Sequence, residues 1–493
     1  MADLFTSIAT RIGPQLLSDP RRVVTRLFVP GDDVPGYRSH ADELVDRLLA
    51  LDEDRALALR ADVVQRYGSR HRDLAEELAN HFEAVSHRIG VETMVTPERA
   101  QLIGACLTDE YAVEGAALTN PSIVPAPDQS GLRDGELRFV LSVRCIGEGH
   151  ISSIGFRTGV IGPGGAVTVD QPSGFAVRSR SRRTHYPRGA LIHDPLPDDD
   201  EEVLAFVWSE LPEQVTDADL DRAVERLPER LSARQDCQPT VARLRSLAAG
   251  CYEVWFPTVG GHTDERILWP HSEAESHGME DARFVRYTDN DGTVEYQGTY
   301  TAASATAGVS HLIRTIDFET FRVIRLAGEA AGTKGLALFP RPIGGVRHAL
   351  CRPHLEKLSL TTSIDGVAWD TPRLVRQPRH DWEILKTGNC GSPIETEAGW
   401  LVIIHGVGPM REYRLGALLL DLHDPSTIRA ELTEPLLVPE PSERDGYVPN
   451  VVYSCGSIVH DDTLVIPYGS TDSGIGFATI PLPDLLKRMR PVA

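Results

Sequence analysis

One pattern recurs through the chain and constrains its fold more than any other feature of the sequence. Two apolar, strand-like runs flank a short gap that carries polar or glycine residues. Such pairs occupy residues 137–145 with 152–160, 295–303 with 309–314, 347–352 with 357–362, 399–405 with 413–420, and 463–468 with 474–480. In the C-terminal half the pairs recur every ~50–65 residues, and short antiparallel strands at this spacing favour radial blades. The five pairs predict a mainly β fold, a five-bladed β-propeller, with a β-sandwich as the alternative.

Two segments depart from this pattern and show helical spacing instead. Within residues 1–111, the stretches 41–52 and 73–89 place leucines and alanines three and four positions apart, and Thr96 and Pro97 form a helix start. Residues 203–211 and 217–247 return to helical spacing after an acidic, proline-bearing stretch. We therefore expect an α-helical N-terminal region (1–111) and a β-propeller domain (112–493) with a helical insertion at about 195–250.

The composition limits the classes of function. A formal net charge of −21 argues against a nucleic-acid binder and suits a soluble cytoplasmic enzyme. The seven cysteines form no Cys-x-x-Cys pair, so we expect neither a zinc site nor a disulfide framework. The first residues lack a signal-peptide pattern, and no apolar run approaches the ~18 residues of a membrane helix. We expect a cytoplasmic protein with no membrane or nucleic-acid partner, and the sequence leaves open whether it forms a homo-oligomer.

The candidate catalytic group lies in residues 277–284. The adjacent carboxylates Glu280 and Asp281 stand between Gly278 and Arg283, just ahead of an apolar, strand-like run. Because side chains on a strand alternate between its faces, we expect only one carboxylate to face a pocket while the other braces the backbone or pairs with Arg283. A carboxyl group beside an arginine at the mouth of a strand suits acid–base chemistry. The alternative is a surface turn with an ordinary ion pair.

Polar residues follow or end the first run of each pair. In a propeller these positions converge on the central channel from distant parts of the sequence. The converging residues are Arg144, His150, Tyr300, Thr301, Arg352, His354, His405, Tyr468 and Asp472. This mixture of arginine, histidine, tyrosine and carboxylate predicts a polar site at the channel.

Seven phrases spread over about residues 120–480 resemble glycoside hydrolase family 130, which contains β-mannoside phosphorylases and related β-mannosidases. They occupy residues 278–283, 389–394, 399–407, 413–417, 421–426, 446–456 and 468–472. Their occurrence together and in this order is the specific signal. The resemblance implies a five-bladed β-propeller, and the two helical segments resemble a longer, oligomannan-type branch of the family.

The resemblance also implies an activity. It is the reversible, inverting phosphorolysis of β-mannosides, expected to be β-1,2-mannooligosaccharides, to α-mannose 1-phosphate. Asp281 matches the family's proton donor, which acts through a hydroxyl of the mannose. Inorganic phosphate is the nucleophile and co-substrate, so one acid suffices and no cofactor or metal is implied. Asp472 matches a position that holds the mannose ring, and Asn120, Glu280 and Tyr300 are further expected substrate contacts.

Phosphate requires fixed cationic hydrogen-bond donors. The candidates are Arg144, Arg157, Lys334, Arg352 and His405, and the sequence around Lys334 and Arg352 matches the family well. The alternative for any one arginine is an ion pair between blades, and for His405 it is a core histidine.

Departures from the family pattern keep other functions open. Ala282 replaces a frequent proline, Cys351 replaces a frequent histidine, and the arginine expected after the first strand occurs only at position 157. The second reading is an inverting β-1,2-mannosidase that uses water, which requires another carboxylate about 6.5–9.5 Å from Asp281. The third is a non-catalytic sugar-binding propeller.

Overall fold

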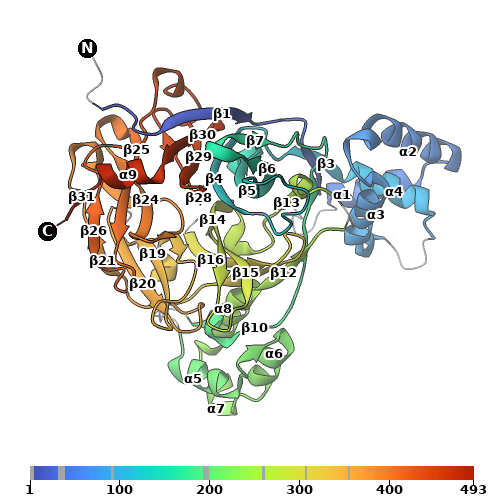
Figure 1. Cartoon of the computed structure of the whole chain (residues 1–493). Helices are drawn as coiled ribbons and strands as arrows, with labels where there is room; N and C mark the ends of the chain where they lie inside the picture. Colours follow the sequence, from blue (N-terminus) through green and yellow to red (C-terminus); the bar gives the residue numbers. More distant parts are fainter. Residues whose placement is uncertain are drawn as a thin grey trace.

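The computed structural model describes residues 5–30, 39–89, 94–192, 199–257, 261–305, 308–353 and 356–492 (Figure 1). Within these residues, five sets of four antiparallel strands follow one another, and we call them the first to fifth units; the first and second are joined in one 12-stranded sheet, and further short strands add to the sheets of the fourth and fifth. The first unit contains β4 (Ala117–Pro125), β5 (Leu137–Ile146), β6 (Ser152–Ile161) and β7 (Val167–Val169). The second contains β14 (Gly278–Thr288), β15 (Val294–Ala303), β16 (Gly308–Thr315) and β17 (Phe321–Arg325).

The remaining units repeat the arrangement. The third contains β18 (Lys334–Leu338), β19 (Arg347–Arg352), β20 (Leu358–Ser363) and β21 (Arg373–Arg376). The fourth contains β22 (Lys386–Asn389), β24 (Gly399–Val407), β25 (Tyr413–Leu420) and β26 (Ile428–Glu431). The fifth contains β27 (Val452–Tyr453), β29 (Thr463–Ser470), β30 (Gly474–Pro481) and, from the N-terminal part of the chain, β1 (Thr10–Leu17). Each of the five strand pairs predicted from sequence is the middle pair of one unit, which confirms the mainly β fold.

The core consists of apolar layers between neighbouring units. Phe156 of the first unit packs in one cluster with Phe284 of the second, and further clusters join the second to the third, the third to the fourth and the fourth to the fifth. Val465 of the fifth unit packs in one cluster with Leu141 and Val143 of the first. Each unit therefore packs on the next, and the last packs on the first.

The N-terminal region is only partly helical. It contains α1 (His40–Leu49), α2 (Glu53–Tyr67), α3 (Leu74–Val85) and α4 (Pro97–Cys106), and the Thr96 hydroxyl accepts a hydrogen bond from the Arg99 amide, as a helix cap does. However, β1 and β2 (Val23–Leu27) precede these helices, and β2 pairs with β3 (Thr108–Ala112). The expectation of helix throughout residues 1–111 is therefore wrong. Ile12 and Leu16 of β1 pack against the core of the fifth and first units, so tertiary packing decides this segment.

The segment between the first and second units contains α5 (Glu201–Glu210), α6 (Asp217–Glu225), α7 (Glu229–Ser232) and α8 (Cys237–Ala249). All four helices contribute to the apolar cluster that joins the second and third units. Figure 1 shows α5–α7 at one edge of the β units and α1–α4 at another. Residues 195–198, at the predicted start of the insertion, lie outside the described residues. No helix in the described part of the chain is long and apolar enough to cross a membrane.

Candidate functional site

Most of the predicted site residues meet at one end of the inner strands. They come from all units: Asn120 from β4, Arg144 from β5, Glu280 and Asp281 from β14, Lys334 from β18, Arg352 from β19, His405 from β24, and Asp472 from the turn between β29 and β30. A chain of contacts joins five of them, and Arg352, which contacts His405, acts on Asp281 through its charge. Asn120 contacts Asp281, Arg144 contacts both Asp281 and Glu280, and Glu280 contacts Lys334. We call this set the polar cluster.

Both adjacent carboxylates bind the same guanidinium. Arg144 Nη2 donates to Glu280 Oε1 at 2.8 Å, and Nη1 donates to Asp281 Oδ1 at 3.1 Å. The two carboxylates therefore do not point to opposite faces, as alternation predicted, although Asp281 Oδ2 also lies 3.9 Å from Arg283 Nη2, which is the predicted pairing. The pairing of β14 with β15 shifts register between Glu280 and Arg283, and Asp281 has a φ of +57°, so a β-bulge interrupts the alternation of side chains.

The same backbone conformation marks two other predicted substrate contacts. Asn120 has a φ of +49° and Asp472 a φ of +50°. Asn and Asp adopt this left-handed region more readily than other non-glycine residues, and such strained positions gather at functional sites. Three positions from three units that share this conformation support a common, shaped site.

The charge state of Asp281 is set by its neighbours. Burial raises the pKa of its carboxyl. The charges of Arg144, Arg283 and Arg352 and the hydrogen bond from Asn120 lower it by more, so the net pKa lies below the ordinary value. Arg283 is itself fixed, because its Nη1 donates to the Asp281 carbonyl at 2.6 Å and its Nε to the Cys390 carbonyl at 2.7 Å. In the protein alone, Asp281 is therefore a carboxylate.

Asp472 shows the opposite shift. Burial raises the pKa of its carboxyl, and the charge of Asp281 adds to this effect, although the hydrogen bond from Thr119 and the charge of Arg144 oppose it. Thr119 Oγ1 donates to Asp472 Oδ1 at 2.8 Å. Sequence reasoning missed Thr119, although its place beside Asn120 at the end of a strand-like run was the available signal.

Arg352 is buried without an anionic partner. Its exposed fraction is 7%, and no carboxylate of the described residues lies within ion-pair distance of its guanidinium. Its Nη1 lies 3.2 Å from His405 Nε2, and its Nε has no hydrogen-bond partner in the described structure. A buried, uncompensated charge is costly, so this position favours binding of an anion.

His405 is neutral and supports Arg352. Burial lowers its pKa well below the ordinary value, and the charges of Arg352, Lys386 and Arg283 lower it further. Its Nε2 is therefore free to accept a hydrogen bond from Arg352. Lys386, which sequence reasoning missed, lies with its Nζ 4.8 Å from the centre of the Tyr413 ring. The result is a positively charged corner beside the carboxylates of the polar cluster.

Two glycines make room for the Arg352 side chain. A Cβ atom at Gly388 would lie 2.2 Å from Arg352 Cδ, and one at Gly335 would lie 2.6 Å from Arg352 Nε. Gly335 also has a φ of +82°. Glycine at these two positions allows the close approach that holds the guanidinium in place.

Two predicted site residues lie elsewhere. Arg157 forms a buried ion pair with Glu114 at 2.6 Å, so its charge is compensated inside the protein and the structure does not bring it to the polar cluster. Tyr300 donates to Glu275 in the core. It neighbours Thr301 on β15, and Thr301 lies beside Lys334, so strand alternation turns Tyr300 away from the cluster.

The other converging residues divide as follows. Tyr468 packs in the core and donates to Glu443 at 2.7 Å. His150 lies in the exposed loop between β5 and β6 and contacts Tyr447. His354 lies outside the described residues.

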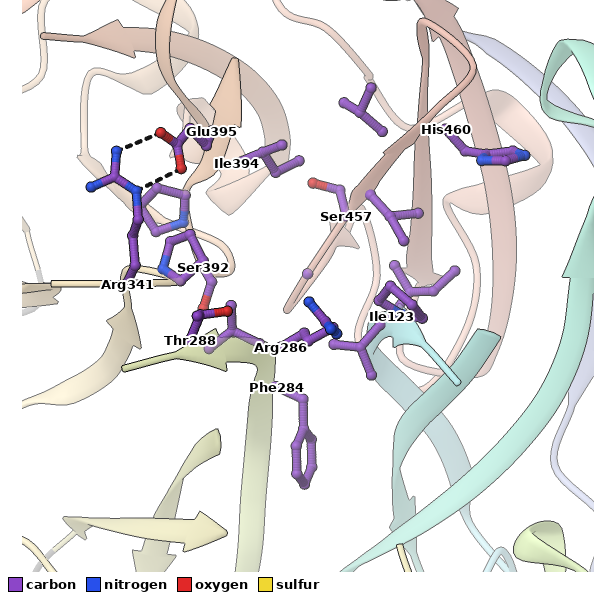
Figure 2. A pocket seen from close by; sticks show the side chains of 18 of the residues that line it. Ile123, Phe284, Arg286, Thr288, Arg341, Ser392, Ile394, Glu395, Ser457 and His460 are labelled. Atoms are coloured by element: carbon purple, nitrogen blue, oxygen red, sulfur yellow. Dashed lines mark hydrogen bonds and ion pairs between the residues drawn. The ribbon is translucent and has the colours of Figure 1, made fainter. Parts of the chain in front are cut away.

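A cavity of about 540 Å³ lies further along the same inner strands. Ile123 on β4 and Phe284 on β14 line it, each three residues beyond a member of the polar cluster. Figure 2 shows its largely apolar wall, Arg286, and the ion pair of Arg341 with Glu395. The cavity contains none of the predicted site residues.

Comparison with known proteins bears on this cluster. A family model described as beta-1,4-mannooligosaccharide phosphorylase matches residues 260–491, which contain Asp281, Lys334, Arg352, His405 and Asp472. The chain is 34% identical to a 1,2-beta-oligomannan phosphorylase of Thermoanaerobacter sp. (strain X514), over 45% of this chain and 74% of that protein. It is 30% identical to a beta-1,2-mannobiose phosphorylase of Listeria innocua, over 46% of this chain and 64% of that protein. The solved structure of a Listeria innocua beta-1,2-mannobiose phosphorylase in complex with beta-1,2-mannobiose aligns with 77% of this chain and 92% of that chain, at 21% identity and a TM-score of 0.45.

Proposed function

Because the chain belongs to glycoside hydrolase family 130, we propose that it is an inverting phosphorylase of β-mannooligosaccharides, with β-1,2-linked chains as substrates. The products are α-mannose 1-phosphate and a shortened oligosaccharide. In the reverse direction the protein transfers a mannosyl group from α-mannose 1-phosphate to an acceptor sugar. The names of the relatives, which describe phosphorylases of β-1,2-mannobiose and oligomannan, support this substrate class.

The observation that carries the proposal is the buried Arg352, which has no anionic partner among the described residues and whose charge acts on the carboxyl group of Asp281. A hydrolase needs no anion at this position, whereas a phosphorylase needs several donors for phosphate. Arg352 and Arg144 supply fixed guanidinium donors, Lys334 supplies a half-exposed ammonium that is paired with Glu280, and Lys386 adds positive charge. Arg157 is not part of this set.

In the proposed reaction, a phosphate oxygen attacks the anomeric carbon from the face opposite the leaving oxygen. The new carbon–oxygen bond forms as the glycosidic bond breaks, so the configuration inverts from β to α. Asp281 gives up its proton, through a hydroxyl of the mannose, to the departing oxygen of the acceptor sugar. Asn120 and Asp472 hold the mannose ring, and Glu280 orients Arg144 and Lys334.

Phosphate binding and proton donation are coupled in this site. The positive charges of Arg144 and Arg352 keep the pKa of Asp281 low in the protein alone. A phosphate dianion bound between them offsets this charge, so the protonated form of Asp281 becomes more accessible when the nucleophile is present. Proton donation without phosphate is thereby disfavoured.

The same proposal includes the architecture and location. The ring of five units is a five-bladed β-propeller domain over residues 112–493, with a helical insertion at about 195–250 and an N-terminal region of residues 1–111. We place the enzyme in the cytoplasm, where inorganic phosphate is supplied and a charged sugar phosphate is retained. Inorganic phosphate is a co-substrate, and the chemistry requires no further cofactor.

The test is incubation with β-1,2-mannobiose in the presence and absence of inorganic phosphate, followed by product analysis. We expect α-mannose 1-phosphate and mannose in equal amounts, with formation strictly dependent on phosphate. Two molecules of free mannose per mannobiose without phosphate would identify a hydrolase. No product from mannobiose or from longer β-1,2-oligomannosides would overturn the enzymatic assignment.

A further inference from the structure

An exposed aromatic side chain lies at the rim of the polar cluster. Tyr447 is 41% exposed, although its backbone is fixed: its amide donates to Ser473 Oγ at 2.9 Å, and the Val448 amide donates to the Thr471 carbonyl at 2.8 Å. Asp472 lies between these two anchoring residues. The segment that carries the tyrosine is therefore tied to the turn that carries a predicted mannose contact.

The ring of Tyr447 is also fixed from the other side of the cluster. Its hydroxyl contacts His150 Nδ1, and the two ring centres lie 5.8 Å apart at 42°. His150 precedes β6, whose first residue, Ser152, accepts a hydrogen bond of 2.8 Å from Arg144 Nε. The pair of His150 and Tyr447, which we call the rim pair, thus joins the first unit to the fifth beside the catalytic carboxylates.

The different exposure of the carboxylates and of Tyr447 indicates which sugar of a substrate lies beside the rim pair. The side chains of Glu280 and Asp281 are about one-fifth exposed, at 20% and 21%, whereas Tyr447 is twice as exposed. The mannose that is cleaved must contact the buried carboxylates, so a neighbouring sugar that leads out of the site passes the rim. A rigid, exposed aromatic ring offers an apolar face to the C–H groups of a pyranose at small entropic cost.

We infer that Tyr447, positioned by His150, is a platform for the acceptor part of the oligomannoside, the sugars beyond the bond that is broken. It contributes binding energy to the acceptor and not to the mannosyl group that is transferred. Such a platform presupposes the proposed phosphorylase function and assigns that function a residue that selects the acceptor sugar.

The reverse reaction separates the two parts of the substrate. Mannosyl transfer from α-mannose 1-phosphate to β-1,2-mannobiose is measured for the wild type, Tyr447→Ala and Tyr447→Phe, with Val448→Ala as the matched control in the same segment. Tyr447→Ala is expected to raise the KM for the acceptor about tenfold, while the KM for α-mannose 1-phosphate changes less than about twofold. Tyr447→Phe keeps the ring but loses the hydroxyl that contacts His150, so a smaller rise in acceptor KM than in Tyr447→Ala is expected, and Val448→Ala is expected to match the wild type.

An unchanged acceptor KM in Tyr447→Ala, or an equal rise of both KM values, would overturn the platform. A wild-type protein that transfers no mannose in either direction would instead overturn the proposed function, and the platform with it. His150→Ala provides a second measurement, because loss of its contact releases the ring: a smaller rise in acceptor KM than in Tyr447→Ala is expected, and no rise would contradict the positioning role of His150.

Discussion

At the residue scale, the surroundings of Asp281 bear on two properties, the proposed donation of a proton and the fixed conformation of the residue. Its left-handed backbone directs the carboxyl toward Arg144 and Asn120, and their contacts fix its orientation. Substitutions can test these properties separately, since asparagine tolerates the same backbone and alanine does not.

Asp281→Asn is expected to lower kcat by a factor on the order of 10³, because the amide keeps the shape but has no acidic proton to give. Binding of β-1,2-mannobiose, measured by calorimetry, should remain close to that of the wild type. Asp281→Ala should lose activity as well, but with a lower thermal stability because of its backbone. Phosphorolysis at the wild-type rate in Asp281→Asn would show that another group supplies the proton.

Arg352→Ala is expected to raise the KM for inorganic phosphate about tenfold or more, with a change below about twofold in the KM for β-1,2-mannobiose. Arg352→Lys should fall between, since an ammonium cannot reproduce the planar fork of donors. Arg341→Ala is the matched control, because this arginine is paired with Glu395 beside the apolar cavity. An equal effect of Arg352→Ala on both KM values would argue against phosphate binding.

The sequence predicted most members of the polar cluster, because residues at the ends of equivalent strands converge. It misplaced Tyr300, where one position of strand alternation separates a core residue from a site residue, and Arg157, whose partner Glu114 is distant in sequence. The prediction also assumed that Glu280 and Asp281 alternate between the two faces of the strand. A bulge interrupts this alternation, and no residue type in the sequence predicts a bulge at this position. Buried ion pairs and bulges arise from tertiary packing, so local sequence patterns do not predict them.

At the scale of elements, the loop ahead of β14 is held by a buried carboxylate. Glu275 accepts hydrogen bonds from the Tyr252 hydroxyl and from the amides of His271 and Ser272. We call Glu275 with the two tyrosines that donate to it, Tyr252 and Tyr300, the hub. His271 packs against Tyr252, and His311 packs against Tyr300. The loop positions the start of the strand that carries Asp281, so the hub supports the site from outside it.

The two histidines give this hub a pH dependence. Burial lowers the pKa of His271 and of His311 to about 4, whereas the unfolded chain titrates near 6.5. Between these values the unfolded state binds more protons than the folded state, so stability falls as the pH falls from about 6.5 to about 4, by up to about 1.4 kcal/mol per pH unit for each histidine. Urea unfolding at pH 7, 6 and 5 measures this slope.

His311→Gln should reduce the slope, whatever its effect on stability at pH 7. Glu275 does not obscure the result: its lowered pKa contributes stability that is lost only below the ordinary carboxyl range. A slope that is identical in His311→Gln and the wild type would contradict the assignment.

At the scale of the whole molecule, the ring is completed by a strand from the other end of the sequence. β1 pairs with β30 of the fifth unit, and Arg11 binds Glu443 and Glu440. Periodicity within residues 1–111 suggested helix throughout, because the partner that turns residues 10–17 into a strand lies more than 450 residues away in the chain. Local sequence patterns predicted the strand pairs of the five units. They did not predict that residues 10–17 pair with the fifth unit.

Deletion of residues 1–17 is therefore expected to lower Tm by several degrees, because β30 loses its neighbour and the apolar side chains of β1 leave the core. Arg11→Ala keeps the strand and removes only its ion pairs, so its loss of stability should be smaller. Differential scanning calorimetry measures both. A truncated protein with the same Tm as the full chain would show that β1 does not stabilise the fifth unit.

The way the polar cluster is assembled has a consequence for protein engineering. Asn120 and Arg144 reach Asp281 from the first unit, upstream of the segment that the family model matches. A minimal protein cut from residues 260–491 would carry Asp281 and Arg352, the proposed acid and anion-binding residue, yet it would lack the two side chains, Asn120 and Arg144, that contact Asp281. Chimeras with other family members should therefore exchange only the loops that carry His150 and Tyr447, and should keep all five units from one parent.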